Sequence, residues 1–224
     1  MEKDMYSKIE QYMLECMNDG AHDSQHIYRV LYSALDIASH YNVDTDVLVA
    51  ASLLHDIGRN AQFQNQELDH AIIGADMAYE YLLGIGWNES RALHVRDCIS
   101  SHRYRSNNVP ESWEAKILFD ADKLDATGTM GIARTIAYIG IVSNPLYCVD
   151  ENGDILIGDI NEEPSFFTEY NWKLKNIYEK FFTDRAREIA SRRQKASIDF
   201  FDSMCDEVIP THKTGMQILN SILR

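Results

Sequence analysis

The chain has 224 residues, a hydrophobic content of 45% and a formal net charge of −14 at pH 7. This length and composition predict a globular protein with a sizeable core. The negative charge argues against broad binding to duplex nucleic acid or to an anionic membrane, because both need clustered Lys and Arg side chains. A small anionic substrate stays compatible with it, since a metal and a few local cations can reverse the field inside a pocket.

The cysteines are widely separated, at Cys16, Cys98, Cys148 and Cys205, and none forms a CxxC pair. This spacing favours free thiols in a reducing compartment over a disulfide framework. The polar segment 1–5 does not resemble a signal peptide, and no apolar run approaches the ~18 residues of a membrane-spanning helix. We therefore expect a cytoplasmic protein that makes no membrane contact.

Helical periodicity dominates the chain. From Ser24 to about Tyr41, apolar residues recur at intervals of three and four, and Asp23 or Ser24 suits the N-cap position. His26 lies one turn before Val30, so its ring should face the core.

A second helix is predicted over residues 46–57, which are apolar nearly all round, as in a central buried helix. Gly58 follows it, where a left-handed C-cap residue is expected. Three further helices should begin at the capping residues Asp69, Asn88 and Ser112.

Polar side chains recur on helix faces that should be buried. His102 falls on the same face as Ile99, and Asp122 and Asp125 fall on the face of Leu118. A buried charge without a partner is costly. These groups therefore need to meet one another or a metal.

The pattern changes after Asn144-Pro145, which should break a helix. Residues 149–157, with Asn152-Gly153 at their centre, predict a small β-hairpin insertion. A calcium loop is disfavoured there, because Gly153 is out of register with the pattern of acidic ligands.

Helical spacing resumes over residues 166–208 with a break near Thr183, and a final short helix is expected after Pro210. No linker or low-complexity segment separates this part from the rest. We expect a single domain over 1–224, with the C-terminal helices, about 166–224, packed on the same core.

Two imidazoles and two carboxylates stand in motifs with a characteristic order. The motifs are His22-Asp23-Ser24-Gln25-His26-Ile27-Tyr28-Arg29-Val30, Leu53-Leu54-His55-Asp56-Ile57-Gly58 and Asp120-Ala121-Asp122-Lys123-Leu124-Asp125-Ala126, followed by Gly131-Ile132-Ala133-Arg134. A mixed nitrogen and oxygen donor set suits a catalytic divalent metal that keeps open positions for water and substrate. The motifs resemble those of the HD-domain superfamily of metal-dependent phosphohydrolases. When the flanking residues are included, they resemble the motifs of the small bacterial HD-domain nucleotide pyrophosphohydrolases.

The resemblance implies an all-α fold, the HD-domain helical bundle, and one divalent metal ion. The implied ligands are His26, His55, Asp56 and Asp122. Asp122 is preferred over Asp120 because the family's ligand directly precedes a basic residue and a leucine, here Lys123 and Leu124. The ion could be Mn, Mg, Co, Fe, Ni or Zn, and Mn is favoured.

His70 and His102 lie between the HD pair and the last aspartate, where relatives with two metals carry additional histidines. A second metal ion, contact with a substrate phosphate or proton donation to the leaving group, and a structural role all stay open for them. They lack the adjacent pair of histidines seen in some binuclear relatives, and this favours a single metal ion.

The expected catalytic groups are Asp56, which could orient the attacking water, and Lys123, which could stabilise charge on the phosphoryl group. His70 and His102 are counted with them, since either could donate a proton to the leaving group. A bound metal would polarise a phosphoryl oxygen and lower the pKa of water. Cations that would offset repulsion between phosphate and the acidic site are expected to bind the substrate. These are Arg29, Arg59, Arg103 and Arg193.

We expect a metal-dependent phosphohydrolase that cleaves a small phosphate or pyrophosphate ester, most naturally a nucleotide such as a nucleoside triphosphate. Two alternatives stay open: a di-iron oxygenase of the HD type, and a non-catalytic ligand sensor stabilised by a metal. Kinship of fold does not decide between these chemistries. The sequence is silent on base preference and on oligomeric state.

Overall fold

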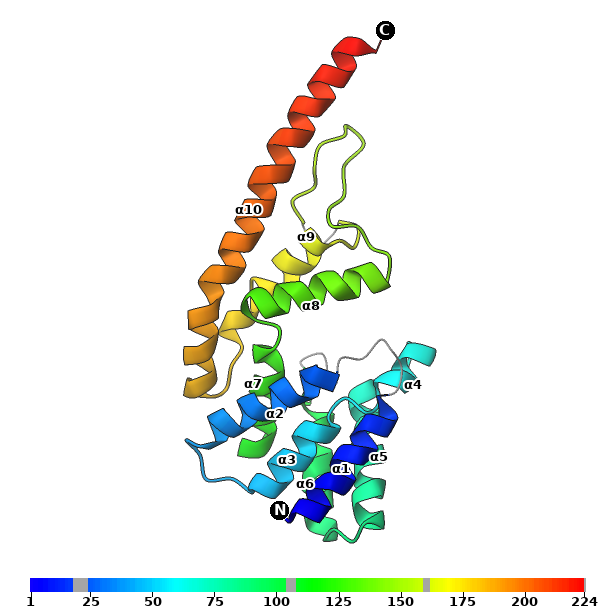
Figure 1. Ribbon diagram of the computed structural model, residues 1–224, viewed down its shortest axis with the longest axis vertical. Helices are drawn as coiled ribbons and strands as arrows, with labels where there is room; N and C mark the ends of the chain where they lie inside the picture. Colours follow the sequence, from blue (N-terminus) through cyan, green and yellow to red (C-terminus); the bar gives the residue numbers. More distant parts are fainter. Residues whose placement is uncertain (18–23, 104–107, 159–161, 224) are drawn as a thin grey trace. The chain divides into compact units, whose positions relative to one another are not determined.

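The computed structural model describes residues 1–17, 24–103, 108–158 and 162–223, and in these ranges it contains helices but no β-sheet (Figure 1). This confirms the all-α prediction. The chain divides into two compact units, Met1–Asp125 with Phe181–Ala186, and Ala126–Lys180 with Arg187–Arg224. That the C-terminal helices share one core with the rest stays a prediction.

The first unit contains seven helices among its described residues: α1 (Lys3–Cys16), α2 (Ser24–Ala38), α3 (Thr45–Leu54), α4 (Arg59–Gln64), α5 (His70–Gly84), α6 (Glu89–Ser100) and α7 (Trp113–Leu124). The predicted caps of α5, α6 and α7 are confirmed, because the side chains of Asp69, Asn88 and Ser112 accept hydrogen bonds from backbone N–H groups of the first turn. Asp23, the other proposed cap, lies outside the described residues.

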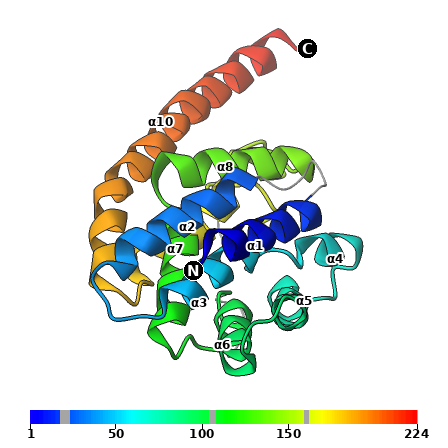
Figure 2. The same cartoon turned by 60° about the horizontal axis from the view of Figure 1, so that its bottom comes forward.

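Helix α3 is the central helix of this unit. Its apolar side chains Val47, Leu48, Leu53 and Leu54 are buried, as their all-round hydrophobic pattern predicts. The helix packs against α1, α2, α5, α6 and α7, and both views show it among its neighbours (Figures 1 and 2). Any side chain at its C-terminal end therefore emerges inside the unit.

Gly58 does not adopt the expected left-handed conformation, since its φ is −81° and it caps the N-terminus of α4. A glycine is needed there for a different reason. A Cβ at this position would lie 2.3 Å from the carbonyl oxygen of His70 and 2.7 Å from the amide nitrogen of Gly74. The missing side chain lets the start of α5 approach the end of α3, which brings His70 towards Asp56.

The second unit contains α8 (Gly128–Ile141), α9 (Phe166–Glu169), a π-helical turn η1 (Tyr170–Leu174), a 3-10 turn η2 (Ile177–Glu179) and most of α10 (Asp184–Ile222). Its core is aromatic and includes Phe166, Phe167, Tyr170 and Phe201. The rings of Tyr170 and Phe201 are stacked, with centroids 3.9 Å apart and planes inclined by 4°.

The expected short helix after Pro210 is wrong, because α10 continues through this residue without a break (Figure 2). Proline removes one backbone hydrogen bond from a helix interior. Pro210 is exposed, so water can satisfy the released carbonyl. The predicted break near Thr183 is confirmed, since α10 begins at Asp184 and the Thr183 hydroxyl accepts a hydrogen bond from the amide of Ala186.

The β-hairpin predicted for 149–157 is wrong as well. A single antiparallel bridge joins Val149 and Ile155, and no strand forms in the described part of this segment. The Asp150 carboxylate accepts hydrogen bonds from the amides of Asn152 and Asp154, at 2.9 and 2.8 Å. These side-chain bonds close a tight turn, and no ladder extends from it.

Among the described helices, none combines the length and the apolar character that crossing a membrane would require.

Candidate metal centre

The six histidines and aspartates predicted for the site lie in the first unit, on elements far apart in the sequence. They are His26 on α2, His55 and Asp56 directly after α3, His70 at the start of α5, His102 just beyond α6, and Asp122 on α7. The end of α3 brings His55 and Asp56 into the interior, where they are 0% and 2% exposed. The prediction that His26 faces the core is confirmed, since it is 3% exposed.

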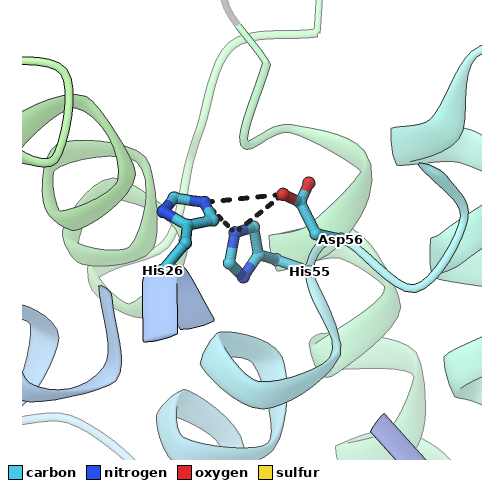
Figure 3. Close-up of side chains that lie close together, drawn as sticks. All are labelled: His26, His55 and Asp56. Carbon is cyan, nitrogen blue, oxygen red and sulfur yellow. Dashed lines mark hydrogen bonds and ion pairs between the residues drawn. The ribbon is translucent and has the colours of Figure 1, made fainter. Parts of the chain in front are cut away.

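His26, His55 and Asp56 form the first group of metal-ligand atoms (Figure 3). Oδ2 of Asp56 lies 3.5 Å from Nε2 of His26 and 3.6 Å from Nε2 of His55. Asp122 lies beside this group, with its Oδ1 3.5 Å from Nε2 of His26. The structure therefore brings together the four residues that the sequence proposes as ligands.

Asp56, His70 and His102 form a second group of buried metal-ligand atoms. Oδ1 of Asp56 lies 3.4 Å from Nε2 of His70 and 3.6 Å from Nε2 of His102. These three atoms make no hydrogen bond in the described part of the chain. Buried polar atoms without partners are rare and costly, so the group is suited to a cation or to a substrate that satisfies all three.

In their neutral form, the four histidines share a tautomer that leaves Nε2 without a proton. Each Nδ1 faces an oxygen: Asp125 Oδ2 for His26, the Ser52 carbonyl for His55, Gln62 Oε1 for His70 and the Ile99 carbonyl for His102, at 2.8, 2.8, 2.6 and 2.6 Å. Carbonyl and carboxylate oxygens only accept, so each Nδ1 must donate. In the neutral rings, the unprotonated Nε2 atoms then lie 3.4 to 3.6 Å from the two oxygens of Asp56.

Burial keeps two of these rings neutral. It lowers the pKa of His55 to about 4 and that of His70 to about 3, and the Arg59 charge contributes to the second shift. Burial alone would raise the pKa of Asp56, but the charge of Arg59 outweighs it and holds that pKa well below its ordinary value. At neutral pH His55 and His70 therefore present unprotonated Nε2 atoms to an ionised carboxylate.

The pKa of Asp122 is also lowered. Burial acts in the opposite direction and is outweighed by the nearby charge of Lys123. Neutral imidazole nitrogens with ionised carboxylates form the donor set that Zn, Mn, Fe and similar divalent ions use in proteins. The residues present therefore fit a divalent metal.

Two of the predicted cations lie directly at the centre. Nε of Arg59 is 2.6 Å from Oδ2 of Asp56, and Nζ of Lys123 is 3.2 Å from Oδ2 of Asp122. Each cation sits beside a carboxylate ligand, where it offsets negative charge and can meet an anionic substrate.

The other arginines predicted to bind substrate contact side chains other than the proposed metal ligands. Arg29 pairs with Asp125, and Nη1 of Arg103 lies 3.0 Å from Oδ1 of Asp69, the residue that caps α5. Arg193 belongs to the second unit, where its Nη1 donates to Oγ1 of Thr127 at 3.4 Å. Their assignment to substrate binding stays a prediction.

Two residues at the centre had no role assigned from the sequence. Helical spacing places Asp125 on the same face as Asp122 but does not identify it as the partner of His26. Gln62, from α4, had no distinguishing motif. Asp120 lies away from the centre, as expected, and accepts hydrogen bonds from the amides of Phe182 and Thr183 and from the Thr183 hydroxyl.

Comparison with known proteins agrees with this geometry. Residues 23–127 match the family model described as the HD domain. The crystal structure of a predicted HD superfamily hydrolase from an uncultured Thermotogales bacterium is 30% identical in sequence. The match covers 90% of this chain and 91% of the Thermotogales protein, with a TM-score of 0.61.

A curated relative is the uncharacterized protein YpgQ of Bacillus subtilis. It is 27% identical over 185 residues, which are 81% of this chain and 82% of that protein. The crystal structure of YpgQ in complex with ADP matches this chain with a TM-score of 0.69 at 25% identity. The match covers 91% of this chain and 97% of the YpgQ chain.

A helical unit that gathers buried imidazoles and carboxylates around one aspartate defines a metal-binding protein of the His/Asp type. This chain belongs to the HD-domain superfamily. The family and the cluster together support a metal-dependent hydrolase.

Proposed function

We propose that this protein is a divalent-metal-dependent phosphohydrolase that cleaves a small phosphate or pyrophosphate ester. The observation that carries the proposal is the convergence of four imidazole Nε2 atoms on the two oxygens of Asp56. A bound divalent cation supplies polarisation of a phosphoryl oxygen and activation of water. His26, His55, Asp56 and Asp122 would hold it.

Side chains of the protein can stabilise the developing charge and orient water. Arg59 and Lys123 lie beside the two carboxylate ligands, so each can direct N–H groups at a phosphoryl oxygen and stabilise the charge that develops there. Asp56 stays ionised at neutral pH and only accepts hydrogen bonds, so it can orient a water molecule that donates a hydrogen bond to it.

We also propose that a second ion binds between Oδ1 of Asp56, Nε2 of His70 and Nε2 of His102. The sequence favoured a single ion, because the two histidines are not adjacent. The support for a second ion is that these three buried atoms face one another without hydrogen bonds. Asp56, His70 and His102 would hold this ion, and a pair of ions would stabilise both the attacking and the leaving oxygen of a phosphoryl group.

A nucleotide is our preferred substrate. The support comes from the YpgQ structure, which contains ADP, and from the arginines near the centre, which can form forked hydrogen bonds with phosphate oxygens. The same proposal includes manganese as the natural metal, a cytoplasmic location and the pyrophosphohydrolase reaction.

The test is a hydrolysis screen of nucleoside triphosphates, nucleoside diphosphates and simple phosphate esters with Mn²⁺, Mg²⁺, Co²⁺ or Zn²⁺. Phosphorus NMR of the products distinguishes release of pyrophosphate from release of phosphate. Asp36→Asn is a matched control, because Asp36 pairs with Arg185 and lies on the solvent side of α2. No metal-stimulated hydrolysis in the parent protein, together with no metal binding, would contradict the proposal.

One observation favours a second candidate function. Asp56 presents each of its oxygens to a different pair of histidines, which also suits two iron ions and oxygen chemistry. Aerobic and anaerobic incubations of iron-loaded protein test this alternative. A product that forms only with O₂ supports the oxygenase, whereas equal turnover without O₂ supports the hydrolase. A protein that binds metal and nucleotide but forms no product with or without O₂ would be the sensor.

A further inference from the structure

Asp125 makes two contacts that link the metal centre to a cation. Its Oδ2 lies 2.8 Å from Nδ1 of His26, and its side chain is 6% exposed. Nε of Arg29 donates to Oδ1 at 2.7 Å, and one terminal nitrogen of the same guanidinium donates to Oδ2 at 3.1 Å. The carboxylate therefore contacts both the imidazole and a forked guanidinium.

This contact distinguishes His26 from the other three histidines of the centre. The Nδ1 atoms of His55, His70 and His102 donate to neutral carbonyl or amide oxygens, whereas that of His26 donates to a carboxylate. A carboxylate acceptor fixes the tautomer and the ring plane of a metal-binding histidine and raises the basicity of its other nitrogen. His26 is thereby held with Nε2 towards Asp56 and Asp122.

Arg29 has the geometry to hold Asp125 in turn. Its guanidinium forms two near-parallel hydrogen bonds to the carboxylate, an arrangement that fixes orientation as well as charge. Arg29 lies one turn after His26 on α2, and Asp125 follows directly after α7, so the pair also ties the two helices together.

We propose that Asp125 is a positioning residue that holds His26 in the Nδ1-protonated tautomer, and that Arg29 acts on the metal centre through Asp125. This inference rests on the proposed function, in which His26 Nε2 ligates the metal. It reassigns Arg29, which the sequence placed among the substrate contacts.

The first experiment reads the tautomer directly in the full-length protein without metal. Nitrogen-15 NMR of the imidazoles separates a protonated from an unprotonated ring nitrogen, and a His26→Gln variant assigns the His26 signals. In the parent protein we expect protonated Nδ1 and unprotonated Nε2. In Asp125→Asn the amide can donate to Nδ1, so a substantial population should carry its proton on Nε2. An unchanged His26 tautomer in this variant overturns the inference, whatever the protein's activity.

The second experiment measures metal affinity, with Mn²⁺ by titration calorimetry and Co²⁺ by its visible absorption. We expect Asp125→Asn to weaken binding by about 10- to 100-fold, the usual effect of losing such a partner. Asp36→Asn is the matched control, because it also removes a forked arginine pair but leaves every histidine untouched. Circular dichroism and thermal melting of the metal-free variants establish that both fold.

The roles of Arg29 and Asp125 are separated by a double-mutant cycle. Arg29→Gln should weaken Mn²⁺ binding less than Asp125→Asn does, and the double variant should bind no more weakly than Asp125→Asn alone. Additive losses would show that Arg29 acts independently of Asp125. Normal Mn²⁺ affinity in Asp125→Asn overturns the positioning role but leaves the proposed hydrolase intact, whereas a parent protein that binds no metal contradicts the hydrolase itself.

Discussion

Nε2 of His26 and Nε2 of His55 lie 3.3 Å apart, although the Nδ1 atom of each ring already donates to a neighbouring oxygen. Two neutral rings in this state direct lone pairs at each other, and this contact is repulsive. A cation between the rings turns the same contact into a favourable one. The fold therefore holds these imidazoles ready for a metal, and the predictions below follow from that arrangement.

Replacing Asp56 should separate metal binding from folding. Asp56 lies after the last turn of α3, so Asp56→Ala leaves the packing of that helix intact and should keep the helical circular dichroism spectrum. It removes the carboxylate shared by both histidine pairs. Mn²⁺ at 100 times its dissociation constant stabilises a one-site protein by about 2.7 kcal/mol. We expect the corresponding rise in Tm for the parent and for Asp36→Asn, and no rise and no hydrolysis for Asp56→Ala. Hydrolysis at the parent's rate with saturating metal would disprove the assignment.

The metal content should be two ions per chain when the protein is loaded with Mn²⁺ and analysed by elemental analysis. His70→Ala and His102→Ala should each reduce the content to one, because the ligands on the Oδ2 side of Asp56 are unchanged. His94→Ala is a control, since His94 contacts Ser112 away from the centre. One ion in the parent that survives both substitutions would instead support the mononuclear site expected from the sequence.

Lys123→Ala should reduce turnover more than it reduces metal affinity. The Lys123 ammonium lies 3.2 Å from Oδ2 of Asp122 and over the ring of Phe119, so it is fixed beside a ligand without being one. We expect a fall in kcat of about 10²-fold, the usual scale for losing one stabilising charge, with metal affinity changed several-fold at most. Lys123→Arg should recover part of the rate. A collapse of metal affinity with normal turnover per bound metal would make Lys123 structural.

The metal-free protein should lose stability as the pH falls from about 6.5 towards 4. Burial lowers the pKa of His55 to about 4 and that of His70 to about 3, so in this range the unfolded chain binds protons that the folded protein does not. The free energy of unfolding then falls by about 1.4 kcal/mol per pH unit for each such histidine.

The pKa values of Asp56 and Asp122 are lowered in the folded protein. These two carboxylates therefore reduce the free energy of unfolding only below their ordinary range near pH 4. Urea melts between pH 4 and 8 measure the slope, and the variant His55→Gln should show a shallower one. A parent protein equally stable at pH 5 and pH 7 would contradict the neutral, buried state of these rings.

Gly58→Ala should destabilise the protein by about 1–3 kcal/mol, the usual cost of overpacking. The new Cβ would lie 2.3 Å from the backbone oxygen of His70 and 2.7 Å from the backbone nitrogen of Gly74, and neither atom can move without shifting α5. Gly84→Ala is the matched control, because a Cβ added there would meet no described atom within 4 Å. Equal melting temperatures for the two variants would show that the close approach of α5 is not required.

Local patterns determined much of this protein. Periodicity placed most of the helices, and caps such as Asp69, Asn88 and Ser112 are read directly from residue type, because a capping side chain bonds its own first turn. The order of His26, His55-Asp56 and Asp122 was enough to point to a metal and to a family. Local rules were weaker where the surroundings decide: Pro210 does not end α10, and 149–157 forms a turn with one bridge in place of a hairpin.

Only the tertiary structure decided which polar groups meet. His70 and His102 stand at opposite ends of the α5–α6 pair in the sequence, and nothing in their spacing shows that both reach Oδ1 of Asp56. The partnership of Asp125 with His26 depends on the contact between α7 and α2. These relationships depend on how close two backbones can approach, as at Gly58 and Gly74. That distance is set by packing between helices, whereas sequence patterns report only on neighbours within one helix.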